Sequence, residues 1–179
     1  TSDPRGGIRG FMIQLQHCGV IGAGQMGAGI AQVAAAAGLD VILTDVSSEQ
    51  LDRAQAGIEK SLGKLVHKER ITASHKDETL SRIRMTDELG ALSQSDILIE
   101  AVPENEELKK RIFGDLAGLA KDEAIFASNT SSISIGRIAA VSGRADRFIG
   151  MHFMNPVPLM KLVEVIRGLE TSEETYQAT

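Results

Sequence analysis

Two polar side chains interrupt apolar segments in the C-terminal third of the sequence. His152 ends the apolar segment 148–152, and Glu164 lies within the apolar segment 162–166. A carboxylate inside a buried strand costs free energy unless it has a partner, and His152 is the obvious candidate. The carboxylate would fix the tautomer of the imidazole, which could then take the proton of an alcohol. From the residues alone, an acid–base pair and two unrelated structural residues both remain open.

A glycine-rich hexapeptide at residues 22–27 fits the pattern G-x-G-x-x-G. It lies between an apolar segment and an alanine-rich stretch, which is the strand-to-helix setting that makes the pattern informative. The first glycine permits a tight turn, the second lets a pyrophosphate approach the backbone, and the third allows close helix packing. The helix N-terminus adds N–H donors. We expect a dinucleotide to contact Gly22, Gly24, Gln25, Met26 and Gly27.

An acidic residue, Asp45, ends the second apolar segment, 18 residues after Gly27. An acid at this place accepts hydrogen bonds from both ribose hydroxyls of NAD and repels the 2′-phosphate of NADP. A turn of glycines beside a solvated aspartate is the alternative. The loop, its setting and the acid together favour NAD as the cofactor, with hydride transfer at a carbinol as the chemistry beside the histidine.

A polar run, Ser-Asn-Thr-Ser-Ser at residues 128–132, follows another short apolar segment. Its serines could cap the next helix, through Ser132 or Ser134. The same hydroxyl and amide groups could instead bind a ligand at the carboxyl edge of a sheet, where α/β proteins place their ligands.

The elements that would position these residues alternate along the chain. Strands are expected at residues 16–21, 40–45, 96–101, 124–128, 148–152 and 162–166, and helices at residues 28–37, 49–70, 105–120 and 134–140. Residues 71–84 are ambiguous, with a second helix packed on the first as one interpretation. Apolar strands alternating with helices predict an α/β fold, a doubly wound, mostly parallel sheet of the Rossmann type with helices on both faces.

Composition narrows the class of protein. A net charge of -5 argues against a nucleic-acid or membrane-surface binder, and no apolar run is long enough for a membrane span. The single cysteine, Cys18, excludes an intrachain disulfide and fits a cytoplasmic protein with a buried structural thiol. We assign no metal site.

The two ends of the chain carry further expectations. Residues 1–11 have no signal core, and we interpret them as an expression leader before a domain that spans residues 12–179. Residues 171–174 (Thr-Ser-Glu-Glu) predict a capping box that opens a new helix. Because the sequence stops five residues later, we expect a truncation there.

Three segments resemble the N-terminal domain of the L-3-hydroxyacyl-CoA dehydrogenases, and the bacterial 3-hydroxybutyryl-CoA enzymes above all. They read GAGQMGAGIAQVAAAAG, SNTSS and HFMNPVPLMKLVEV, in this order. The resemblance implies reversible NAD-dependent oxidation of an (S)-3-hydroxyacyl-CoA, with short chains preferred. It implies that His152 is the catalytic base, that Glu164 orients it, and that Ser131 hydrogen-bonds the 3-oxygen of the substrate.

The resemblance also implies binding residues. Those expected to line the nicotinamide and ribose are Glu104, Lys109 and Asn129, with Glu100 as a helper near the sheet edge. Ser61 and Lys68 match positions that meet the CoA moiety, although Lys68 alone would suit a solvated helix face.

One departure from the family is that the helical C-terminal domain, with a fourth active-site residue and most of the homodimer contact, has no counterpart here. This chain could therefore bind NAD and turn over poorly. A dehydrogenase of a free hydroxyacid and a non-catalytic NAD-binding module remain as alternatives.

Overall fold

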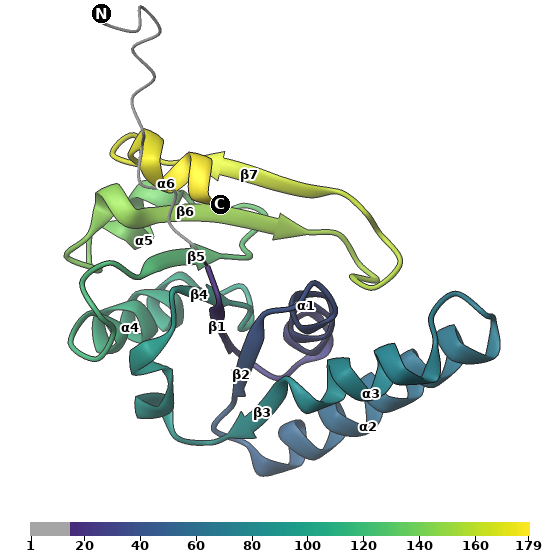
Figure 1. Ribbon diagram of the computed structural model, residues 1–179. Coiled ribbons are helices and arrows are strands. Elements are labelled where there is room, and N and C mark those ends of the chain that lie inside the picture. The colour runs from purple at the N-terminus through teal and green to yellow at the C-terminus, as the bar shows by residue number, and fades with distance from the viewer. Residues whose placement is uncertain (1–14) are drawn as a thin grey trace, which may run out of the picture.

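One sheet of seven strands organises the part of the chain that the structure, a computed structural model, describes: residues 15–179 (Figure 1). The expected leader, residues 1–11, lies outside this range. The strands are β1 (His17–Ile21), β2 (Asp40–Thr44), β3 (Ile83–Thr86), β4 (Ile97–Glu100), β5 (Ile125–Ser128), β6 (Phe148–Phe153) and β7 (Val163–Arg167).

The strand order is β3-β2-β1-β4-β5-β6-β7. Neighbouring strands from β3 to β6 pair in parallel, and β7 pairs antiparallel with β6. The order reverses between β1 and β4, so the carboxyl ends of these two strands form the switch point at which doubly wound folds bind dinucleotides. The predicted Rossmann-type, mostly parallel sheet is confirmed.

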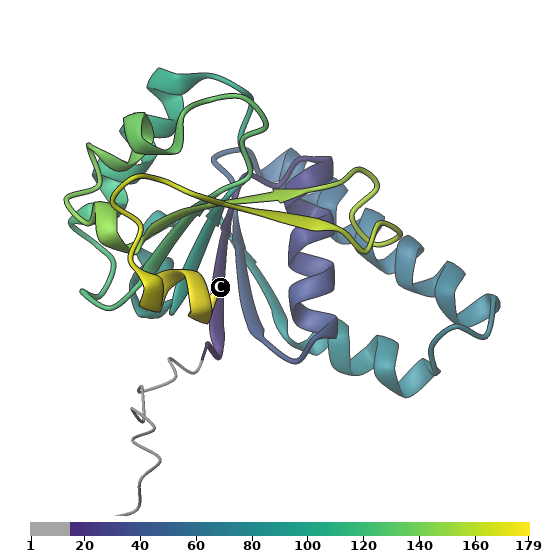
Figure 2. The same ribbon diagram turned by 90° about the horizontal axis from the view of Figure 1, so that it is seen from above.

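Helices cover both faces of the sheet, as Figure 2 shows. One side carries α1 (Gln25–Ala36), α2 (Ser48–His67) and α3 (Ala73–Ser81), and the other carries α4 (Glu106–Ala117) and α5 (Ile135–Ala139). The 3-10 helices η1 (Leu89–Gln94) and η2 (Ala145–Arg147) and the short helix α6 (Glu173–Ala178) complete the elements. Within residues 15–179, no helix is both long and apolar enough to cross a membrane.

The alternation of side chains along each strand produces two cores. In β4, Ile97 and Ile99 pack into the core beneath α1 and α2, whereas Leu98 joins the opposite core beneath α4 and α5. Phe113 from α4 meets Phe148 from β6 edge-on in that second core, at 4.6 Å between ring centroids. Both faces of the central strands are therefore buried, which explains their continuous apolar sequences.

Most predicted elements are confirmed, with shifted ends. The first helix begins at Gln25 instead of residue 28, so part of the glycine motif is helical. Ser47 caps α2 by accepting a hydrogen bond from the backbone N–H of Gln50. Residues 71–84, the segment left ambiguous, contain the helix α3, which was one interpretation and which packs against α1 and α2. The strand β3 after it was not predicted.

The predicted C-terminal helix is α6. Ser172 caps it by accepting a hydrogen bond from the backbone N–H of Thr175. The hydroxyl of Thr171 donates to the carbonyl of Phe148 at 2.6 Å, and that of Thr175 donates to the carbonyl of Asp146. These bonds attach α6 to the start of β6.

Candidate functional site

The three motif glycines meet different surroundings. Gly22 has a φ of +101°, a left-handed conformation that favours glycine. A Cβ on Gly27 would lie 1.7 Å from the carbonyl oxygen of Gly22, so only glycine lets the helix start there. A Cβ on Gly24 would meet no heavy atom within 4 Å. No described part of the protein fills the space beside Gly24, as expected if a ligand approaches the backbone there.

The N-terminus of α1 has no side-chain cap. Gly24 is the N-cap residue, and the first turn contains no acidic side chain. The N–H groups of Gln25, Met26 and Gly27 belong to the set that an α-helix cannot satisfy internally. Together with the helix dipole, they make this end of α1 suited to an anionic group such as a pyrophosphate.

Asp45 connects the glycine loop to the end of β2. Its carboxylate accepts hydrogen bonds from the backbone N–H of Ala23, at 2.8 Å, and of Ser47, at 2.9 Å. The side chain is partly buried, and Val46 beside it is exposed. The acid therefore lies against the loop, at the place where a ribose bound along the switch point would meet it.

The structure brings His152 and Glu164 together. They are direct partners in the antiparallel register of β6 and β7, and His152 Nδ1 lies 2.8 Å from Glu164 Oε2. This pairing explains their separation in the sequence. With Nδ1 occupied by the carboxylate, Nε2 is the ring nitrogen left for a substrate.

The reason given for this pair from the sequence was wrong. Residues 162–166 were taken for a buried strand, but β7 lies at the edge of the sheet and four of its five residues are exposed. The Glu164 side chain is 52% exposed, against 25% for His152. The carboxylate faces His152 because the two residues are cross-strand partners. Its burial is not the reason, since the side chain is half exposed.

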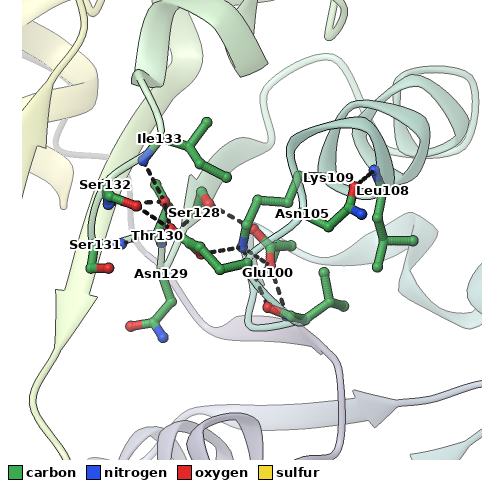
Figure 3. Close-up of polar contacts among 12 residues, drawn as sticks. Glu100, Asn105, Leu108, Lys109, Ser128, Asn129, Thr130, Ser131, Ser132 and Ile133 are labelled. Carbon is green, nitrogen blue, oxygen red and sulfur yellow. Dashed lines mark hydrogen bonds and ion pairs between the residues drawn. The ribbon is translucent and has the colours of Figure 1, made fainter.

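A polar cluster joins the loops that follow β4 and β5 (Figure 3). Oε1 of Glu104 accepts hydrogen bonds from the hydroxyls of Thr130 and Ser132 and from the backbone N–H of Ser131. Ser131 itself is exposed, and within residues 15–179 its hydroxyl has no hydrogen-bond partner. Side-chain and backbone hydrogen bonds to Glu104 thus fix residues 130–132, and the Ser131 hydroxyl is left for a ligand.

Lys109 lies behind this cluster rather than on its surface. The resemblance expects it to line the cofactor, but its side chain is 1% exposed. Its Nζ lies 2.7 Å from Glu100 Oε1 and 3.3 Å from Glu104 Oε2. Glu100, the expected helper, is fully buried and also accepts hydrogen bonds from Ser128 Oγ and the Val102 N–H.

Two asparagines connect the segment around His152 to its neighbours. Asn129 Oδ1 accepts a hydrogen bond from the backbone N–H of Phe153, next to His152, at 2.9 Å. Asn155, to which the sequence analysis assigned no role, accepts one from the Gln25 side chain at 3.1 Å. Its position in the segment HFMNP, three residues after the histidine, was the signal that could have identified it.

The residues expected to meet CoA line a groove beside α2. Ser61 borders a cavity of about 380 Å³ that reaches from Gly24 and Gln25 to the segment 155–158. It also borders a second cavity of about 330 Å³ that extends to Lys68. Lys60 and Lys64 line the second cavity as well, so Lys68 belongs to a basic wall. Within residues 15–179, no cluster of histidine, cysteine or acidic side chains could hold a metal ion.

Comparison with known proteins assigns the family. Residues 17–179 match the family described as 3-hydroxyacyl-CoA dehydrogenase, NAD binding domain. This chain belongs to that family. The cofactor of this 3-hydroxyacyl-CoA dehydrogenase domain is NAD, and the open space at Gly24, the uncapped N-terminus of α1 and the carboxylate of Asp45 fit it.

Named relatives support the assignment. The domain is 52% identical to 3-hydroxybutyryl-CoA dehydrogenase of Bradyrhizobium diazoefficiens, over 92% of this chain and 56% of that protein. It is 44% identical to the mitochondrial hydroxyacyl-coenzyme A dehydrogenase of Rattus norvegicus, over 93% of this chain and 55% of that protein. The crystal structure of (S)-3-hydroxybutyryl-CoA dehydrogenase from Ralstonia eutropha matches with a TM-score of 0.90 and 47% identity, over 92% of this chain and 58% of that chain. The domain thus spans just over half the length of these relatives.

Proposed function

We propose that this domain supplies the NAD site and the general base for reversible oxidation of (S)-3-hydroxyacyl-CoA to 3-ketoacyl-CoA. The observation that carries the proposal is the 2.8 Å contact between His152 Nδ1 and Glu164 Oε2. The pair lies at the carboxyl end of β6, and Asn129 links that end to the loop after β5. A base and a loop with a free hydroxyl, that of Ser131, thus share the edge of the sheet where the cofactor loop also lies.

In the direction of oxidation, His152 Nε2 takes the proton of the substrate's 3-hydroxyl. Glu164 keeps the proton of the neutral imidazole on Nδ1, so that Nε2 carries the accepting lone pair, and it stabilises the imidazolium that forms. When bound, NAD would supply the acceptor for the hydride on carbon 3 of the substrate. In reduction, His152 returns the proton to the same oxygen.

Ser131 orients the substrate in this proposal. Its hydroxyl donates a hydrogen bond to the 3-oxygen, which keeps carbon 3 in line for hydride loss. Glu104 and Asn129 border the nicotinamide and its ribose, and Lys109 holds Glu104 from the protein interior. Asp45 accepts hydrogen bonds from the hydroxyls of the adenosine ribose.

The acyl-CoA thioester would lie along α2. Ser61 meets the CoA moiety, and Lys68 offers a positive charge to its phosphates. The relatives from Bradyrhizobium diazoefficiens and Ralstonia eutropha are named 3-hydroxybutyryl-CoA dehydrogenases, and we propose a short acyl chain for this protein too.

The test is oxidation of NADH driven by acetoacetyl-CoA, followed at 340 nm with a high concentration of this chain. Free acetoacetate is the matched substrate without CoA. NADH binding is measured by fluorescence in the same samples. Turnover with acetoacetyl-CoA alone supports the proposal, whereas equal turnover with both substrates contradicts the CoA assignment. NADH binding without any turnover shows that this domain supplies the NAD site but does not catalyse the reaction by itself.

His152→Gln should lower kcat by about a hundredfold or more, the usual contribution of a general base, with NADH affinity nearly unchanged. His75→Gln is the control. His75 lies on α3, which precedes β3, and β3 is the edge strand at the opposite end of the sheet from β6 and β7. A comparable loss of NADH binding in His152→Gln would instead make His152 a structural residue.

A further inference from the structure

The buried ammonium group of Lys109 forms ion pairs with two carboxylates, those of Glu100 and Glu104. A lone charge at this depth would be costly, and the fully buried Glu100 compensates it through the 2.7 Å ion pair. Glu100 also accepts hydrogen bonds from Val102 and Ser128 at the ends of β4 and β5. The carboxylate that holds the ammonium is therefore itself fixed at the ends of β4 and β5.

The second carboxylate, Glu104, has a different setting. Its side chain is 38% exposed, so water could solvate it. Instead, Oε2 faces Lys109 at 3.3 Å, and Oε1 faces the loop at residues 130–132. Burial raises the pKa of Glu104, but the hydrogen bond from Thr130 and the charge of Lys109 outweigh it, so the pKa lies below its usual value. Glu104 therefore faces the loop as an anion.

We propose that Lys109 is a positioning residue that acts through Glu104 to set the place of Ser131. The buried ammonium holds one oxygen of the Glu104 carboxylate, and the other oxygen accepts the Ser131 backbone N–H at 3.2 Å. The Ser131 hydroxyl, which has no partner within residues 15–179, is thus presented by a contact chain that starts inside the protein. The catalytic consequence rests on the role proposed above for Ser131.

A purely structural role for Lys109 makes a different prediction. If the lysine only compensated Glu100, its removal would affect the sheet ends and would be independent of Glu104. If it acts through Glu104, removing Glu104 already removes the whole effect on the loop, so the two changes are not additive. The double-mutant cycle separates these roles.

The experiment compares Lys109→Met, Glu104→Ala and the double variant by amide hydrogen exchange of this chain. Lys110→Met is the matched control, because the neighbouring Lys110 pairs with Glu106 and Glu107 on α4. Lys109→Met should speed exchange at the Ser131 amide by about tenfold, the scale of a lost charge-assisted hydrogen bond. Exchange in the middle of β4 and β5 reports the loss of the buried ion pair with Glu100, and the increase at Ser131 should exceed any local change there. The control should match the wild type.

The double variant should exchange at Ser131 as Glu104→Ala does. Additive effects, or an unchanged Ser131 amide in Lys109→Met, would overturn the proposal. If Lys109→Met does not fold, the variant Glu100→Gln/Lys109→Met removes both buried charges and keeps the acceptor for Val102. The same faster exchange at Ser131 is then expected, and exchange at the wild-type rate overturns the proposal.

Turnover adds a second readout. With acetoacetyl-CoA, Lys109→Met should lower kcat by about tenfold or more through misplacement of Ser131, and KM for NADH should rise no more than it does in Glu104→Ala. If the wild-type chain shows no turnover, the proposed function fails on this domain, and the exchange data alone decide whether Lys109 positions Ser131.

Discussion

Alanine can replace Gly24 without disturbing any contact among the described residues. Its Cβ would meet no heavy atom within 4 Å, and its φ of -67° and ψ of -174° are extended values that alanine adopts readily. Alanine restricts the unfolded chain, which stabilises the fold by about 0.4–1 kcal/mol, but it is a poorer N-cap residue than glycine by a similar amount. The two effects offset each other, so the free energy of unfolding should change by less than about 1 kcal/mol.

Binding of NADH should change more. The added methyl group stands at the N-cap of α1, where the pyrophosphate must approach the backbone. We expect NADH affinity to fall by about tenfold or more in Gly24→Ala, which corresponds to about 1.4 kcal/mol. In Gly27→Ala, by contrast, the Cβ would lie 1.7 Å from the Gly22 carbonyl oxygen. That backbone clash should lower the free energy of unfolding by about 3 kcal/mol.

NADH fluorescence titrations and urea unfolding of the same samples check both values. Gly114→Ala is the matched control, since Gly114 lies inside α4 with open space around its Cβ. It should stabilise the fold by about 0.5–1 kcal/mol and leave NADH affinity unchanged. Wild-type affinity in Gly24→Ala would refute the assignment of the loop to the pyrophosphate, and a loss of stability as large as that of Gly27→Ala would refute the open space.

Three further predictions concern stability and reactivity. Burial raises the pKa of Asp96, but hydrogen bonds from Lys121 and two backbone N–H groups outweigh it and lower the pKa from 3.8 to about 2. The ionised carboxylate of Asp96 therefore stabilises the fold fully above pH 3.8, and the free energy of unfolding should fall by about 2 kcal/mol as the pH falls to about 2. Urea unfolding of Asp96→Asn over the same pH range should lack this decrease. Burial raises the pKa of Cys18 to about 12, so the native thiol should react with Ellman's reagent only as fast as the protein unfolds. Ser47→Ala should lower the free energy of unfolding by about 1 kcal/mol, measured by thermal denaturation, through loss of the α2 cap.

The sequence was sufficient to predict the central strands and the cofactor loop. Strands buried on both faces are apolar throughout, and β1, β4 and β5 have this pattern because helices cover both sides. The glycine motif could be recognised because the backbone requires glycine at two of its positions. Gly22 has a left-handed φ, and Gly27 lies too close to the Gly22 carbonyl for a Cβ. Constraints of this kind act through neighbours in the sequence.

Features set by the rim of the sheet could not be predicted in the same way. The edge strand β3 is short and only partly buried, and Arg84 interrupts its apolar character. The edge strand β7 has an apolar sequence and yet is mostly exposed, so its composition misrepresented the environment of Glu164. At an edge, one neighbour is missing, and the apolar pattern no longer reports burial.

The positions of Lys109 and Ser131 depend on contacts between successive strand ends. Hydrogen bonds run across the carboxyl edge of the sheet, from the Ala101 N–H to the Ile21 carbonyl and from the Asn129 N–H to the Glu100 carbonyl. Each loop is therefore placed by the strand end beside it, far away in the sequence. A lysine in a charged helix segment gives no sign that such an edge will bury it. Sequence spacing can thus predict which residues belong to this site. The packing of neighbouring strand ends determines which of them face a ligand and which are buried beneath those residues.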